Sequence, residues 1–120
     1  MSAFKNQSFI MRLRFALAGL AHAIGAERSL RTQLAAFAAA LAGLIFFRPA
    51  PHWWALVLLA SGAVLAAELF NTAIEHLADH LHPQLHLQIR IVKDCAAAAV
   101  LVLVLGALGV AGALAWSLWH

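Results

Sequence analysis

The sequence predicts an all-α integral membrane protein, in which an N-terminal amphipathic surface helix precedes three transmembrane helices. The 120 residues are 64% hydrophobic and only 11% charged, and their mean hydropathy is +0.87. A soluble domain is about 25% charged. Long uncharged stretches recur along the chain, and turn signals separate them. We therefore interpret residues 1–120 as a single membrane domain.

The charge balance indicates which partners to expect. The formal charge of +3 comes from 8 Lys and Arg against 5 Asp and Glu, and most of the basic residues lie up to Arg31. This asymmetry favours an anionic membrane surface as the partner of the basic N-terminal part. Nucleic acid is excluded as a partner, because no basic and aromatic residues alternate as a base-stacking groove requires. The single Cys95 excludes an intrachain disulfide.

The surface helix is expected over about residues 4–26. Its basic residues are Lys5, Arg12 and Arg14, and apolar residues recur at helical spacing at Phe9, Leu13, Leu17, Leu20 and Ile24. This pattern is typical of an amphipathic helix at a membrane surface. A signal peptide is the alternative, because basic, apolar and small residues follow one another up to Ala21-His22-Ala23. The remaining chain, however, does not look like a mature secreted protein.

The first transmembrane helix is expected over residues 28–47. Thr32 to Phe47 is a run of 16 uncharged residues, which spans about 24 Å as a helix. The helix reaches a hydrocarbon core of about 30 Å if it begins near Glu27. Arg48-Pro49-Ala50-Pro51 ends it, since two prolines so close together block continuation. Trp53 and Trp54 fit an interfacial aromatic belt.

The second transmembrane helix, over residues 52–79, carries the most informative polar residues of the chain. An uncharged run from Trp53 to Ala67 continues without a turn signal into a polar stretch. At about 3.6 residues per turn, one stripe of the helix then carries Glu68, Asn71, Glu75 and Asp79. A helix of this length measures about 42 Å, more than the hydrocarbon thickness. The carboxylates are therefore expected to straddle the membrane interface.

A polar connection and the third transmembrane helix complete the chain. Residues 80–94 contain Pro83 and are expected to link the two helices. Cys95 to Trp119 carries no charge, so the last span is expected over residues 94–119. Gly106, Gly109 and Gly112 give this helix a surface for close packing, without specifying the partner. Cys95 itself is interpreted as a packing residue.

The distribution of Lys and Arg predicts a cytoplasmic N-terminus and an outer C-terminus, because only Arg48 lies on the far side of the first span. This topology brings charged residues from three segments to the cytoplasmic interface, where nucleotide is available. They are Glu27, Glu68, Glu75, Asp79, Lys93 and Asp94.

These residue types suit phosphoryl transfer. Carboxylates seven residues apart, with a third from a neighbouring helix, can hold Mg²⁺ together with phosphates. A lysine supplies positive charge for a polyphosphate, and a further carboxylate can take a proton from an attacking hydroxyl. The alternative is that Glu75, Asp79, Lys93 and Asp94 merely solvate helix ends. That alternative is weaker for Glu68, since ionisable residues within a membrane are candidates for function.

Other chemical motifs are weak or absent. His76 with His80, and His82 with His86, have the i, i+4 spacing of a transition-metal pair, but Pro83 interrupts the geometry. We interpret these histidines as part of a solvated connection. The sequence has neither a glycine-rich phosphate loop nor a Ser-His-Asp or Cys-His arrangement.

Several stretches resemble one known family, the small prokaryotic diacylglycerol kinases, which include undecaprenol kinases. The similarity is close in Glu68-Leu-Phe-Asn-Thr-Ala-Ile-Glu75-His-Leu-Ala-Asp79 and in Lys93-Asp94-Cys-Ala-Ala-Ala-Ala-Val-Leu. It is weaker in Ala18-Gly19-Leu20 and in Glu27-Arg28-Ser-Leu-Arg31. The stretches follow the family's order and spacing over about residues 9–112.

The resemblance implies a homotrimer in the bacterial inner membrane, with active sites between subunits at the cytoplasmic interface. It implies phosphorylation of a lipid hydroxyl by Mg-ATP. By position, Glu68 would be the general base and Asn71 would organise the centre. The other roles implied by the resemblance are metal binding by Glu27 and Glu75, and nucleotide contacts by His86, Lys93 and Asp94.

The substrate expected is diacylglycerol, with undecaprenol as the alternative. Gln33 stands where many diacylglycerol-specific relatives carry Glu, and Phe15 stands where Tyr is common, so both weaken the preference for diacylglycerol. A small proton-coupled transporter is an alternative of another class. It requires a fourth span and a carboxylate nearer the midplane. A non-catalytic assembly subunit would leave the clustered carboxylates and lysine without a purpose.

Overall fold

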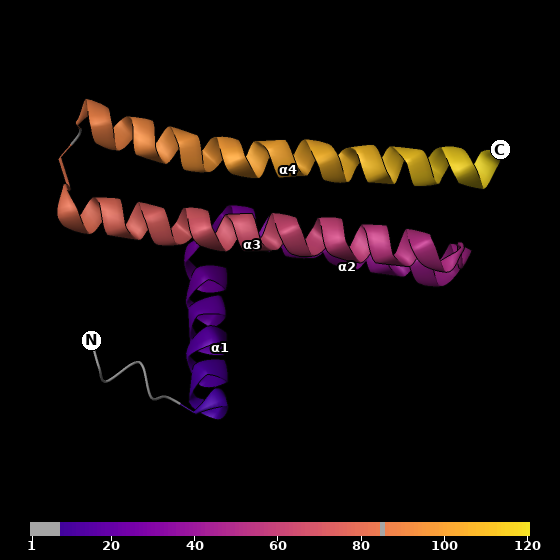
Figure 1. Cartoon of the computed structure of the whole chain (residues 1–120), viewed down its shortest axis with the longest axis horizontal. Coiled ribbons are helices and arrows are strands. Elements are labelled where there is room, and N and C mark those ends of the chain that lie inside the picture. The colour runs from indigo at the N-terminus through magenta and orange to yellow at the C-terminus, as the bar shows by residue number, and fades with distance from the viewer. Residues whose placement is uncertain (1–7, 85) are drawn as a thin grey trace.

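The computed structural model describes residues 8–84 and 86–120, and these residues form helices and no strand. The helices are α1 (Phe9–Ala26), α2 (Arg28–Phe47), α3 (Pro51–Leu81) and α4 (Leu87–Trp119). Helices α2, α3 and α4 lie lengthwise beside one another, and α1 runs crosswise to them (Figure 1). The all-helical fold expected from the sequence is thus confirmed. Residues 4–7 of the expected surface helix, including Lys5, lie outside the described residues.

All four helices are long and apolar enough to cross a membrane by length and composition. The sequence predicts three spans and a surface helix, so α1 is the additional candidate. Helices α3 and α4, with 31 and 33 residues, measure about 46 and 50 Å. Both exceed a hydrocarbon core of about 30 Å. The chain is therefore a multi-pass membrane protein whose longest helices extend beyond the hydrocarbon.

The junction between α1 and α2 is one residue, Glu27, at which the backbone is extended with φ −115° and ψ 116°. The guanidinium of Arg31 donates hydrogen bonds to the carbonyl oxygens of Ile24, at 2.7 Å, and Gly25, at 3.2 Å. These carbonyls end α1 and lack partners within it, and a cation there also complements the helix dipole. Arg31 thus fixes how α1 turns into α2.

The turn between α2 and α3 lies at the proline-rich stretch. Arg48 ends α2 in the left-handed region, with φ 48° and ψ 56°. Its amide donates to the carbonyl oxygen of Leu44 at 2.9 Å, as in the left-handed caps that commonly end helices. Pro51 then begins α3, where its missing amide proton costs nothing. The tight turn sets α2 and α3 antiparallel.

Helix α4 begins at Leu87, earlier than the span expected from residue 94. The ring Nδ1 of His86 accepts a hydrogen bond from the amide of Gln88 at 3.1 Å, which caps the helix. The first turns carry Arg90, Lys93 and Asp94, which lower the hydropathy but do not oppose helix formation in water. The polar connection is consequently short, and part of it is helical.

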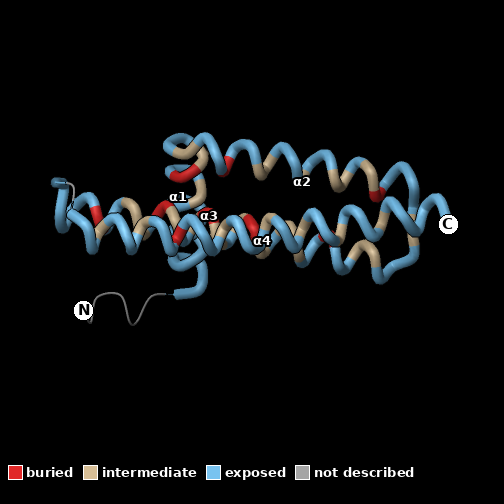
Figure 2. The backbone as a smooth tube through the Cα atoms, turned by 90° about the horizontal axis from the view of Figure 1, so that it is seen from above, coloured by how far each residue is buried: buried red, intermediate tan, exposed pale blue. Residues whose placement is uncertain are grey.

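Helix α3 is the centre of the fold. It contacts α1, α2 and α4, whereas within residues 8–84 and 86–120 neither α1 nor α2 contacts α4. Figure 2 shows the few buried positions along these contacts. The buried line on α3 consists of Val57, Val64, Glu68, Thr72 and Ala78. Large apolar side chains elsewhere, most of all on α4, are exposed, as expected where lipid or another subunit covers them.

Candidate active site

Glu68 lies in the buried line of α3 and is only 3% exposed. The hydroxyl of Ser29, in the first turn of α2, donates a hydrogen bond to its Oε2 atom at 2.9 Å. A buried carboxylate is costly unless it is hydrogen-bonded. The antiparallel pairing of α2 and α3 supplies that bond, and Ser29 is therefore part of the surroundings of Glu68.

The polar stripe that follows Glu68 becomes progressively more exposed. Asn71 and Glu75 are half-buried, and Asp79 is exposed. The Asn71 amide nitrogen donates to Glu75 Oε1 at 3.4 Å. Its carbonyl oxygen, Oδ1, is buried and has no hydrogen-bond partner among residues 8–84 and 86–120. An unsatisfied buried acceptor costs about 1–3 kcal/mol, so this atom is suited to a proton donor or a cation.

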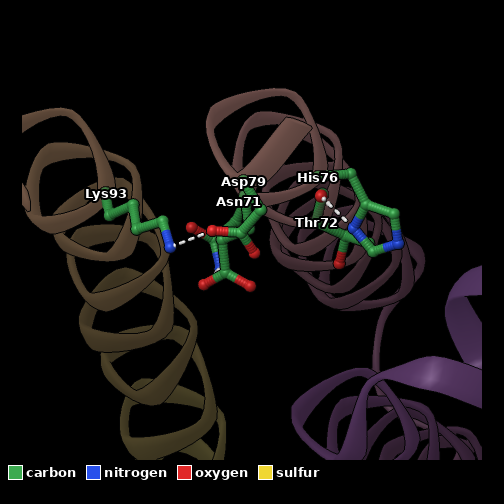
Figure 3. Close-up of polar contacts among 6 residues, drawn as sticks. Asn71, Thr72, His76, Asp79 and Lys93 are labelled. Atoms are coloured by element: carbon green, nitrogen blue, oxygen red, sulfur yellow. Dashed lines mark hydrogen bonds and ion pairs between the residues drawn. The ribbon is translucent and has the colours of Figure 1, made fainter. Parts of the chain in front are cut away.

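A pair of histidines joins α1 to α3. The Nε2 atoms of His22 and His76 lie 3.0 Å apart, and Nδ1 of His76 lies 3.0 Å from the carbonyl oxygen of Thr72 (Figure 3). A carbonyl only accepts, so Nδ1 of His76 carries the proton. In the neutral ring Nε2 is then the acceptor, and His22 donates to it. His76 thus pairs with a residue of another helix and not with His80.

The start of α4 faces the end of α3 across a polar cavity of about 270 Å³. The Lys93 ammonium donates to Asp79 Oδ1 (Figure 3), and Arg90 lies 4.0 Å from Asp94 in a second exposed ion pair. The cavity is lined by Asp79, His82, Pro83, Gln84, His86, Ile89, Arg90, Lys93 and Asp94. The three residues expected to contact nucleotide, His86, Lys93 and Asp94, are therefore brought together.

The expected metal ligands, Glu27 and Glu75, come from different elements. Glu27 is half-buried at the α1–α2 junction, and its side chain does not cap α2. No group of three or more His, Cys, Asp or Glu residues is placed to hold a metal within the described part of the chain. Carboxylate oxygens and the unpartnered Asn71 Oδ1 are hard ligands of the kind Mg²⁺ prefers.

Four residues of this region were not predicted from the sequence as site residues. They are His22, Ser29, Thr72 and Arg90. The partners His22 and His76 are 54 residues apart, and Ser29 and Glu68 are 39 apart. No local spacing marks such pairs. The available signal for Ser29 is its position two residues after Glu27, within a stretch that carries the weaker family similarity.

The fold and site together define a small helical membrane protein whose ionisable residues gather at one end of its central helix. A family model described as prokaryotic diacylglycerol kinase matches residues 14–115. The chain belongs to this family, which confirms the resemblance found in its sequence.

A diacylglycerol kinase of Synechocystis sp. is 31% identical over 108 residues. The aligned region covers 89% of this chain but only 62% of that relative, so the chain spans less than two thirds of its length. No solved structure matches the chain.

Proposed function

We propose that the protein is an ATP-dependent lipid kinase, which transfers the γ-phosphoryl group of Mg-ATP to the hydroxyl of a membrane lipid. The proposed substrate is diacylglycerol, which would give phosphatidic acid, and undecaprenol is the second candidate. The observation that carries the proposal is the buried Glu68, hydrogen-bonded to Ser29, at the head of a stripe that ends in a polar cavity. Membership of the family and the name of the Synechocystis relative support it.

Glu68 is the proposed general base. The lipid oxygen forms a bond to the γ-phosphorus while the bond from that phosphorus to the ADP oxygen breaks, and the hydroxyl proton goes to the Glu68 carboxylate. Ser29 occupies Oε2, which leaves Oε1 to accept the proton. A correctly placed base contributes about 10²–10⁴-fold to such a step. Asn71, one turn further along α3, organises the centre between Glu68 and Glu75.

Glu27 and Glu75 are the proposed magnesium ligands, and Glu75 is hydrogen-bonded to Asn71, whose buried Oδ1 is a further candidate ligand. The bound ion would neutralise charge on the phosphates, which is the main electrostatic requirement of phosphoryl transfer. Asn71 contributes by donating to Glu75 Oε1, which orients that carboxylate.

The polar cavity is the proposed nucleotide site, with His86, Lys93 and Asp94 in its lining. Lys93 must exchange the Asp79 carboxylate for a phosphate. This exchange costs little, because the two side chains are 36% and 62% exposed and such pairs contribute about 0–1 kcal/mol. The His86 Nδ1 atom is occupied by the helix cap, so its neutral ring presents Nε2–H as a donor to phosphate oxygen.

The proposed arrangement is a homotrimer in the bacterial inner membrane, with a cytoplasmic N-terminus and α1 on the membrane surface. The crosswise direction of α1 (Figure 1) supports a surface location and argues against a fourth span. A groove of about 330 Å³ between α2, α3 and α4, lined mainly by apolar residues, supports assembly with further helices. A proton-coupled transporter, which requires a fourth span, is disfavoured by the crosswise direction of α1.

The direct test is a phosphoryl-transfer assay with the purified protein in lipid vesicles. Radiolabelled ATP and Mg²⁺ are supplied with diacylglycerol or undecaprenol in parallel, and labelled lipid is quantified. We expect label in the lipid, with faster transfer to diacylglycerol. Faster transfer to undecaprenol would select the second substrate, and no transfer to either lipid would overturn the proposed activity.

A further inference from the structure

We propose that His22 and His76 are a positioning pair, which holds the α1–α2 junction against α3 so that Glu27 and Glu75 bind one magnesium–nucleotide complex. This inference rests on the proposed function, because it concerns the metal site of that reaction. Neither histidine contacts the reacting groups in the proposal. Their contribution is to fix the relative position of two carboxylates that the chain carries on separate helices.

The contacts of His22 and Ser29 bracket both carboxylates. On one side of the interface, Glu27 lies between His22 and Ser29 in the chain; on the other, Glu75 lies between Glu68 and His76. His22 bonds to His76 and Ser29 bonds to Glu68. The segment that carries Glu27 is therefore tied to α3 on both sides, at the residue after Glu75 and about two helical turns before it.

Apolar packing alone holds α1 weakly. Ala23 is its one buried residue, while its large side chains, including Phe9 and Leu17, are exposed. A small alanine contact contributes little, since hydrophobic stabilisation scales with the area buried. Within the described residues, the exposed contact between His22 and His76, next to Ala23, is the one side-chain hydrogen bond that joins α1 to α3, and it adds to the turn set by Arg31.

The pair has a defined direction. Thr72, which is 6% exposed, holds the His76 ring by accepting from Nδ1, so the His76 Nε2 lone pair faces His22. The rings meet edge to face, with centroids 5.1 Å apart and planes at 81°. The 3.0 Å between the two Nε2 atoms is the distance of a hydrogen bond.

The test compares His22→Leu, His22→Gln and a matched control, His80→Leu, one helical turn beyond His76 on α3. Mn²⁺ is titrated into each purified variant with a non-hydrolysable ATP analogue, and binding is followed by electron paramagnetic resonance. We expect His22→Leu to weaken Mn²⁺ binding about tenfold, which is the lower end of the loss seen when a group that orients metal ligands is removed. His22→Gln should retain binding, because its amide nitrogen donates from nearly the same position as Nε2. His80→Leu should bind as the wild type does.

Lipid phosphorylation gives a second readout. His22→Leu should raise the Mg²⁺ concentration for half-maximal activity about tenfold, with kcat at saturating Mg²⁺ within about twofold of wild type. His22→Leu/His76→Leu should be no worse than either single variant, because both remove the same contact. Additive losses, or unchanged Mn²⁺ affinity in folded His22→Leu, would overturn the inference.

Folding and the proposed function are checked separately. If circular dichroism shows that His22→Leu loses helix, His22→Asn is compared with His22→Gln: the shorter amide should weaken Mn²⁺ binding, and equal affinities would refute the pair. A wild-type protein that binds no Mn²⁺ with the analogue and phosphorylates no lipid removes the proposed function, and the inference with it. Normal wild-type binding that His22→Leu does not change removes the inference alone.

Discussion

The two ends of the candidate site are built differently. Where α3 meets α1 and α2, the contacts between described residues are hydrogen bonds without an ion pair: Ser29 to Glu68 at 2.9 Å, which is partly buried, and His22 to His76 at 3.0 Å, which is exposed. Where α3 meets α4, the contacts are exposed ion pairs, between Lys93 and Asp79 and between Arg90 and Asp94, around a polar cavity.

This difference corresponds to the needs of the two proposed substrates. A base for a lipid hydroxyl must be fixed, because small displacements of reacting groups are costly in rate. Charges for a nucleotide must be able to exchange partners as it binds and leaves, and exposed ion pairs contribute only about 0–1 kcal/mol. The partly buried bond from Ser29 to Glu68 supplies fixed geometry, whereas the exposed ion pairs of α4 supply exchangeable charge.

Replacing the base should give the largest effect. Glu68→Gln retains an oxygen that can accept from Ser29 but cannot take a proton, so we expect kcat to fall about 10²–10⁴-fold. Thermal unfolding in detergent should remain close to that of the wild type. Ser29→Ala, which removes only the orienting bond, serves as the graded comparison and should lose less. Full activity in Glu68→Gln would exclude Glu68 as the base.

Replacing the proposed metal ligand Glu75 should have an intermediate effect, on the Mg²⁺ dependence of activity. Glu75→Gln keeps an acceptor for Asn71 but loses the charge that attracts a cation. We expect the Mg²⁺ concentration for half-maximal activity to rise about 10–100-fold, measured at saturating lipid. A Mg²⁺ dependence identical to that of the wild type would contradict the assigned role.

Breaking an exposed ion pair should give the smallest effect. Asp79→Asn should change the free energy of unfolding by less than about 1 kcal/mol. It should shift KM for ATP by no more than about fivefold, since 1.4 kcal/mol corresponds to a factor of ten. Denaturation and ATP titrations measure the two quantities. A hundredfold loss would show that the α3–α4 end is as rigidly organised as the other end.

Much of the fold could be predicted because single-residue signals control it. The boundary expected between residues 26 and 28 and the prolines after Arg48 separate the same helices in the structure. The beginning of α4 was the main difference. Hydropathy predicts where a helix enters the hydrocarbon, and not where the helix itself begins. The polar residues from Leu87 to Asp94 are helical, although they precede the apolar span.

The stripe on α3 shows where prediction of the site reached its limit. Helical spacing predicts that Glu68, Asn71, Glu75 and Asp79 share a face, and their exposure does rise along α3. Spacing does not reveal that Thr72 joins Glu68 in the buried line, because that depends on which face of α3 meets its neighbours. The pairing of His22 with His76 depends on the direction of α1, which the Glu27 junction and Arg31 set in three dimensions.

The central position of α3 has a consequence for biogenesis. Because α1 and α2 contact α3 but not α4 in the described chain, contacts around Glu68 and His76 can form once α3 is inserted. The cavity with Lys93 requires α4, which leaves the ribosome after α1, α2 and α3. We therefore expect the acidic end of the site to be organised first during synthesis, and the cationic end to be added to it.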